Sequence, residues 1–79
     1  MKSIHDVFDH LEGSTVRVTF TDGEESLLEI VDCSHVRLND TVLGVPAGAA
    51  PSEDGVQFRM AYIDRVEELS GRLLFDRAN

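Results

Sequence analysis

The chain has 79 residues, and its fifteen acidic against seven basic residues give a formal net charge of −8. A chain of this length forms one small domain, and large small-molecule clefts or multi-residue active sites usually need more chain. The acidic charge and the single lysine, Lys2, lower the expectation of nucleic-acid binding, which depends on basic residues.

The composition also bears on the compartment of the protein. One cysteine excludes an internal disulfide and a zinc site built from thiolates alone, which is typical of a reducing cytoplasm. The sequence contains no run of roughly 18 or more apolar residues, and residues 1–13 carry acids and histidines where a signal peptide would be apolar. We therefore expect a cytoplasmic protein with no membrane partner.

Residues 3–12 are predicted to form a short amphipathic helix. Ser3 is a candidate N-cap, Asp6 suits the first turn, and Gly13 supplies a left-handed stop. The apolar residues follow the i, i+3, i+4, i+7 spacing of one helical face: Ile4, Val7, Phe8 and Leu11. A helix this short needs to dock on the rest of the domain.

Three strands are predicted next. The first alternates from Val16 to Phe20 and ends at Asp22-Gly23, which is a strong hairpin signal. The second, Ser26–Asp32, is apolar on both faces at its centre, and such a pattern indicates a strongly bent sheet. The third strand is expected to contain three alternating apolar residues: Val36, Leu38 and Val42.

The second half of the chain begins with a loop, residues 44–55, that holds both prolines and several glycines. Strand alternation resumes in the next segment: Val56, Phe58, Met60 and Tyr62. Ile63-Asp64 is expected to form a corner before a last strand, Arg65–Ser70, with Val66 and Leu69 pointing inward. The tail, residues 71–79, carries an apolar patch, Leu73-Leu74-Phe75, which either packs back on the domain or covers a neighbouring subunit.

These elements predict a mainly β fold in which an N-terminal helix precedes a five-stranded, strongly bent, SH3-like barrel over residues 14–70. Such a barrel leaves free backbone edges on its last two strands, and oligomerisation would remove them.

The pattern resembles the Sm-like family, which comprises Sm, LSm and bacterial Hfq-type proteins. The resemblance spans roughly Ile4 to Leu69 and rests on apolar positions and one aspartate. It is carried by these motifs: Val16-x-Val18-x-Phe20 with Asp22-Gly23, Leu28-x-x-Val31-Asp32 with Val36 and Leu38, and Tyr62-Ile63-Asp64-Arg65-Val66-Glu67-Glu68-Leu69.

The resemblance implies a cyclic homo-oligomer of about five to seven subunits, in which the fourth strand of one subunit joins the fifth strand of the next. The residues that it places at the subunit interface are Phe58, Met60, Tyr62, Val66 and Leu69. The function that it implies is non-catalytic, with single-stranded RNA as the suggested ligand. The alternative is an SH3-like protein-interaction or structural module with no nucleic-acid role.

The RNA site of the family carries over onto a small set of residues: Asp32, Ser34, His35, Tyr62 and Asp64. This chain departs from the family pattern at several of them. Ser34 stands where a stacking ring is expected, and His35 would serve only after a shift of one residue. Ile63-Asp64 replaces the Lys-His pair of Hfq-type proteins, so the positive charge of that motif is missing.

Other groups have a functional and a structural interpretation. Cys33 with His35 could form a nucleophile and base, or the cysteine could simply pack. Asp6 and His10 have a metal-compatible i, i+4 spacing, but two ligands do not make a site. We expect no metal, no cofactor and no catalytic residue.

Charged residues of the strands also leave two interpretations open. The acidic run near the hairpin is either a cation or basic-partner surface or a solvated face: Asp22, Glu24, Glu25 and Glu29. The arginines on or next to the strands either meet phosphates or pair with acids across a subunit interface: Arg37, Arg59 and Arg65.

Overall fold

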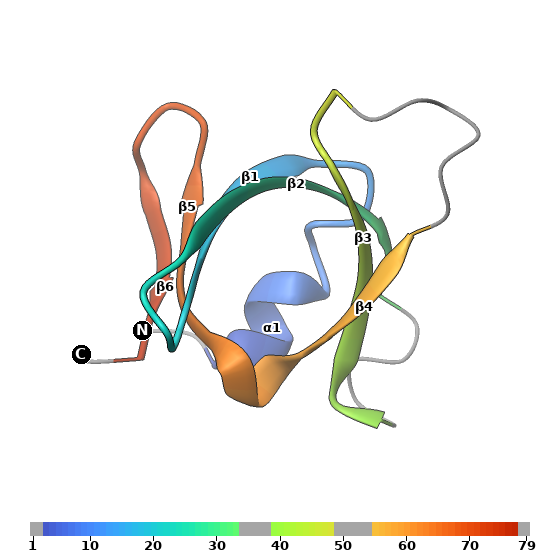
Figure 1. The fold of residues 1–79 in the computed structure, drawn as a ribbon, viewed down its shortest axis with the longest axis horizontal. Coiled ribbons are helices and arrows are strands. Elements are labelled where there is room, and N and C mark those ends of the chain that lie inside the picture. The colour runs from blue at the N-terminus through green and yellow to red at the C-terminus, as the bar shows by residue number, and fades with distance from the viewer. Residues whose placement is uncertain (1–2, 34–38, 49–54, 78–79) are drawn as a thin grey trace.

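The computed structural model describes residues 3–33, 39–48 and 55–77. A short helix precedes one antiparallel sheet in the order β4-β3-β2-β1-β5-β6, and the sheet curves around the helix (Figure 1). The elements are α1 (Ile4–Phe8), β1 (Thr15–Phe20), β2 (Glu25–Asp32), β3 (Thr41–Pro46), β4 (Val56–Arg59), the 3-10 turn η1 (Met60–Tyr62), β5 (Ile63–Glu68) and β6 (Leu73–Asp76).

The predicted mainly β fold with an N-terminal helix is confirmed, but the strand count differs. The described residues form six strands rather than five, in an open sheet whose ends are β4 and β6. The sixth strand comes from the tail: Leu73–Asp76 pairs with β5. Phe75 is buried and Leu74 packs against the core, so the apolar patch of the tail packs back on its own chain.

Helix α1 begins as the sequence predicts. The Oγ of Ser3 accepts a hydrogen bond from the backbone N–H of Asp6 at 3.2 Å, which is the N-cap interaction. The α-helix ends at Phe8, earlier than expected, because Leu11 N–H donates to the Phe8 carbonyl in a tighter i, i+3 turn. None of the helices in these residues has the length and apolarity that crossing a membrane requires.

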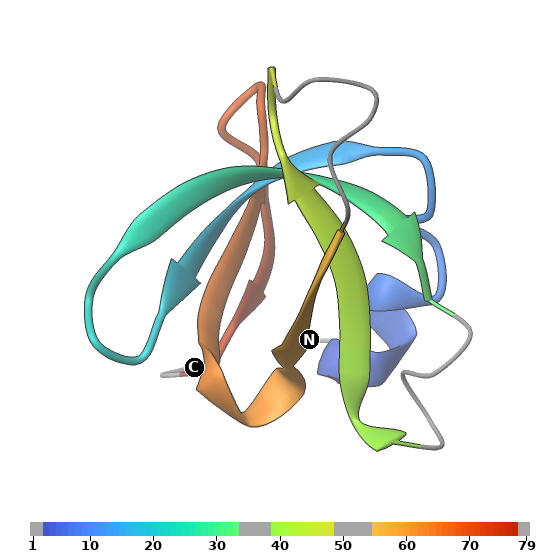
Figure 2. The same ribbon diagram turned by 45° about the vertical axis from the view of Figure 1, so that its right-hand side comes forward.

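Strand β2 is the longest strand and bends across the sheet (Figure 2). Its first half pairs with β1, where Leu28 lies opposite Val16, and its second half pairs with β3, where Ile30 lies opposite Gly44. The β1–β2 turn is closed by Phe20, whose carbonyl accepts from Gly23 N–H at 2.9 Å. Gly23 has a φ of +93°, a conformation that glycine adopts without steric penalty.

The core lies between α1 and the concave face of the sheet. Phe8, Val18, Ile30 and Val66 each have 0 % exposure, so the helix covers the apolar face that alternation directs inward. The other buried apolar residues are Ile4, Val7, Leu11, Val16, Leu28, Val42, Met60, Ile63 and Phe75.

Three boundaries differ from the predicted ones. β3 continues to Pro46, so the strand extends into the expected loop 44–55. β4 ends at Arg59, because the next three residues form η1 rather than strand. β5 ends at Glu68, which leaves Leu69 in the β5–β6 turn.

Leu69 is 58 % exposed, and the prediction that it points inward is wrong. Its turn is closed by Glu68, whose carbonyl accepts from Gly71 N–H at 2.9 Å. Val36 and Leu38, expected in the third strand, lie outside the described residues.

Candidate functional site

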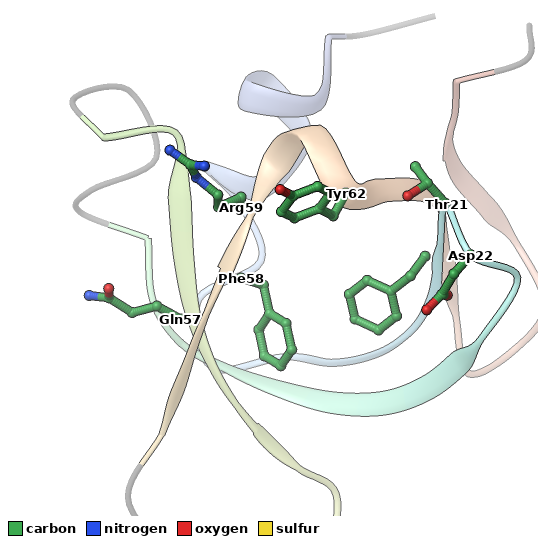
Figure 3. Close-up of a pocket in the computed structure, with 7 residues that line it drawn as sticks. Thr21, Asp22, Gln57, Phe58, Arg59 and Tyr62 are labelled. Atoms are coloured by element: carbon green, nitrogen blue, oxygen red, sulfur yellow. The ribbon is translucent and has the colours of Figure 1, made fainter.

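A pocket of about 680 Å³ opens between the β1–β2 turn, strand β4 and η1 (Figure 3). Its apolar lining comes from three aromatic side chains on three elements, and we call it the aromatic pocket. The residues that line it are Phe20, Thr21, Asp22, Gln57, Phe58, Arg59 and Tyr62.

The aromatic side chains form a stacked pair and an exposed ring. The ring centroids of Phe20 and Phe58 are 5.5 Å apart with an interplanar angle of 29°, an offset-stacked arrangement. Both side chains are partly buried against the core. Tyr62 is 56 % exposed and lies above Phe58 in the view of Figure 3, so apolar surface remains accessible at the pocket.

Backbone hydrogen bonds hold the three walls together. Thr21 N–H donates to the Tyr62 carbonyl at 2.9 Å, which ties the β1–β2 turn to η1. Met60 N–H donates to the Asp40 carbonyl at 2.8 Å, which ties η1 to the start of β3. The pocket is therefore preformed by long-range contacts rather than by one flexible loop.

Arg77, which follows β6, also holds η1 in place through side-chain hydrogen bonds. Its Nη2 donates to the Met60 carbonyl at 2.8 Å and its Nε donates to the Ile63 carbonyl at 3.0 Å. Its guanidinium also lies 5.6 Å from the centre of the Phe75 ring. The C-terminal segment thus fixes η1, and with it the backbone of Tyr62.

The aromatic pocket reaches the edge of β4. Successive side chains of a strand point to opposite faces, yet Gln57, Phe58 and Arg59 all line the pocket. A pocket lined from both faces of a strand wraps around its edge, and the other edge of β4 is paired with β3. In the described part of the chain, no strand pairs with the edge of β4 that faces the pocket.

The pocket lining contains both an acidic and a basic residue, and an exposed residue that follows the lining in the β1–β2 turn is acidic. Asp22 and Arg59 both line the pocket. Asp22 Oδ1 accepts from Glu24 N–H at 2.9 Å, which orders the turn, and Glu24 and Glu25 are exposed beside it. The β1–β2 turn therefore presents two exposed carboxylates, Asp22 and Glu24, and Asp22 lines the pocket.

The residues expected to bind RNA are not brought into one described cluster. Asp32 lies at the end of β2 opposite Leu43, whereas Asp64 lies in β5, which pairs with β1 and β6. Tyr62 lines the aromatic pocket, and neither aspartate is among its lining residues. Ser34 and His35 lie outside the described residues.

The residues expected at a subunit interface fall into two groups. Met60 and Val66, at 1 % and 0 % exposure, pack in the core of the single chain. Phe58 is partly buried in the aromatic pocket, whereas Tyr62 and Leu69 are exposed. Of the five residues, Met60 and Val66 are therefore not accessible to a neighbouring subunit, whereas Tyr62, Leu69 and the part of Phe58 that lines the pocket are accessible.

Cys33 follows β2 and packs against the core. Burial first, and then the nearby carboxylates of Glu12, Asp32 and Asp9, raise the pKa of its thiol to about 11. The thiol therefore stays protonated at neutral pH, the opposite of an activated nucleophile.

In the described residues, no third potential ligand joins Asp6 and His10, the pair with metal-compatible spacing. Within residues 3–33, 39–48 and 55–77, no group of three or more potential ligands gathers. Both side chains line a second pocket, of about 480 Å³, between α1 and the start of β6.

Sequence reasoning missed the aromatic pocket and Arg77. The sequence predicts strands at Phe20 and Phe58. The pairing of β1 with β5, which the pattern does not reveal, brings Phe20 next to η1 and so brings the two rings together. The sequence shows no signal for Arg77, because its partners are backbone carbonyls of η1.

Comparisons with family models, with curated proteins and with solved structures found no match. The function of this chain is therefore inferred from its own residues.

Proposed function

We propose that this chain is a non-catalytic protein-interaction module with an SH3-like curved sheet, and that it binds its partner at the aromatic pocket. The observation that supports this most is Tyr62, an exposed aromatic side chain beside two half-buried ones. Partly exposed aromatic residues in a preformed, mostly apolar depression are typical of binding hot spots.

The electrostatics favour a protein over a nucleic acid as the partner. The chain carries a net charge of −8, and the turn beside the pocket adds exposed carboxylates rather than basic groups. Nucleic-acid affinity comes largely from neutralising phosphates with lysine and arginine, and among the described residues that line the pocket Arg59 is the single basic one.

A Sm-like ring that binds RNA is the second candidate function. It is favoured by the open sheet, because in the described residues β4 and β6 each have one edge without a partner strand. The outer edge of β5, which the resemblance gives to a neighbouring subunit, is paired with β6 in this chain. A ring would therefore join β4 of one subunit to β6 of the next.

The test compares matched surface variants in an affinity capture from the source cells. Tyr62→Ala removes the exposed ring of the pocket, and Leu69→Ala removes an apolar side chain of similar exposure at 58 % outside it. We expect a partner that is captured by the wild type and by Leu69→Ala but lost with Tyr62→Ala. A partner retained by Tyr62→Ala would overturn the assignment of the pocket.

The same preparations separate the two candidate functions. Titration with oligo-U and oligo-A at low salt, together with the native mass, tests the ring. A discrete oligomer of about five to seven subunits with salt-sensitive RNA binding would favour the second candidate. A monomer without RNA affinity would favour the protein-interaction module.

A further inference from the structure

The edge of β4 with which no strand of the described residues pairs presents specific backbone groups. Met60 N–H donates to the Asp40 carbonyl of the chain segment that leads into β3. Backbone groups alternate sides along a strand, so the N–H and C=O groups of Gln57 and Arg59 are directed away from β3. These are the groups that a further strand would bond.

The aromatic pocket lies along that same edge. Phe58 sits between Gln57 and Arg59, and its ring stacks on Phe20 at 5.5 Å. A strand added to β4 would direct alternate side chains toward these rings, and an apolar side chain there would contact Tyr62 as well. Backbone pairing and side-chain anchoring thus fall at one place.

The charge identifies the kind of strand that fits. Asp22 lines the pocket, and Glu24 is exposed on the same turn. A second copy of this chain would bring its own net charge of −8 to the edge, which makes self-association unfavourable compared with binding a basic segment. Lysine or arginine side chains next to the anchor would face these carboxylates.

We propose that the partner contributes an extended, positively charged segment that adds as a strand to β4 and places an apolar side chain in the aromatic pocket. This rests on the proposed function and specifies its ligand. The affinity comes from the backbone groups of Gln57 and Arg59, and the specificity comes from the aromatic rings and the acidic turn.

Arg59 allows the edge to be tested without breaking the sheet. Its φ is −79°, within the range of proline, and its N–H is directed away from β3. Arg59→Pro therefore removes one outward donor and the guanidinium. Arg59→Ala removes the side chain beyond Cβ but keeps the backbone N–H. It is therefore the matched reference, and the difference between the two variants reports on that N–H.

The probe is an eight-residue peptide of alternating valine and lysine. The control is the same peptide with glutamate in place of lysine. Binding is measured by the fluorescence of Tyr62, which is the single tyrosine of a chain without tryptophan. The chemical shifts of the Gln57 and Arg59 amides are followed by NMR.

We expect the lysine peptide to change Tyr62 fluorescence and both amide shifts, and the glutamate peptide to change neither. Arg59→Ala should bind the lysine peptide two- to threefold more tightly, since a like charge is gone. Arg59→Pro should bind the lysine peptide at least about fivefold more weakly than Arg59→Ala does, because the loss of one hydrogen bond reduces the affinity by about this factor.

Equal binding by the two Arg59 variants would overturn strand addition, and equal binding of the two peptides would overturn the preference for a basic segment. No response to either peptide, with a captured partner that still requires Tyr62, would overturn this inference and leave the proposed function standing. A captured partner indifferent to Tyr62 would overturn both.

Discussion

Arg77 and Met60 are joined by a hydrogen bond of 2.8 Å, from the guanidinium of one to the backbone carbonyl of the other. A side chain near the end of the chain thereby holds the turn that carries Tyr62. The same guanidinium binds the Ile63 carbonyl, so two backbone acceptors depend on one donor group.

Replacing Arg77 with alanine should therefore loosen η1. We expect a loss of roughly 1–2 kcal/mol in the free energy of unfolding, because hydrogen bonds from a charged donor are removed. Quenching of Tyr62 fluorescence by acrylamide should rise in the folded protein. Arg72→Ala is the control, since Arg72 is exposed and its guanidinium lies 3.6 Å from the Glu68 carboxylate, as in a weak surface ion pair. Equal effects of the two variants would contradict the role of Arg77.

Phe75 should be the most sensitive position of the tail. It is 8 % exposed and lies opposite Val66 in the β5–β6 pairing. Phe75→Ala should reduce the free energy of unfolding by roughly 3 kcal/mol, and Phe75→Leu by about 1 kcal/mol, in urea titrations. Leu69→Ala, at an exposed position, should stay within about 0.5 kcal/mol of the wild type. An unchanged urea midpoint for Phe75→Ala would refute the packing of the tail on the sheet.

Asp40 combines a strained backbone with two contacts. Its φ is +58°, its side chain lies 2.6 Å from His5 Nε2, and its carbonyl accepts from Met60. Asparagine tolerates this left-handed conformation and keeps an acceptor, whereas alanine does neither. We expect Asp40→Ala to be less stable than Asp40→Asn by about 1 kcal/mol in thermal unfolding. Equal melting temperatures would show that neither the conformation nor the contact matters.

Cys33 should be unreactive at neutral pH. Burial raises its pKa from 9.0 to about 11, so its alkylation by iodoacetamide at pH 8 should be about a hundredfold slower than that of an ordinary thiol. The rate should rise until the pH passes about 11. Alkylation at the rate of free cysteine would show that the thiol is exposed.

The same raised pKa makes stability depend on pH. The folded chain holds the thiol proton more tightly than the unfolded chain, so the contribution of Cys33 is complete below pH 9.0 and is lost as the pH rises through about 11. Urea titrations of the wild type and of Cys33→Ala across this window should converge at high pH. Parallel curves would contradict the shift.

The elements that local patterns define were predictable from the sequence. The alternation from Val16 to Phe20 and the glycine at position 23 specify a hairpin through contacts between neighbours in the chain. The N-cap at Ser3 is equally local. These features need no knowledge of the tertiary fold.

The errors arose where tertiary contacts overrule the pattern. Met60 and Tyr62 continue the apolar alternation of Phe58, which predicts that the strand goes on through them. Instead, Met60 N–H donates to the Asp40 carbonyl, and residues Met60–Tyr62 form a 3-10 turn that leaves Tyr62 exposed. Leu69 follows Val66 at an apolar spacing, yet the β5–β6 turn begins there. The aromatic pocket depends on such contacts throughout, so its position could not be predicted.

The place of β1 between β2 and β5 has a consequence for folding during synthesis. Val18 pairs with Val66, so a strand from the first quarter of the chain completes its ladder only when the last quarter is available. Pairings between segments so far apart in sequence form slowly, because a long loop must close first. Residues through Val66 must therefore be synthesised before the core can close, and until then the apolar face of the first hairpin is open to chaperones.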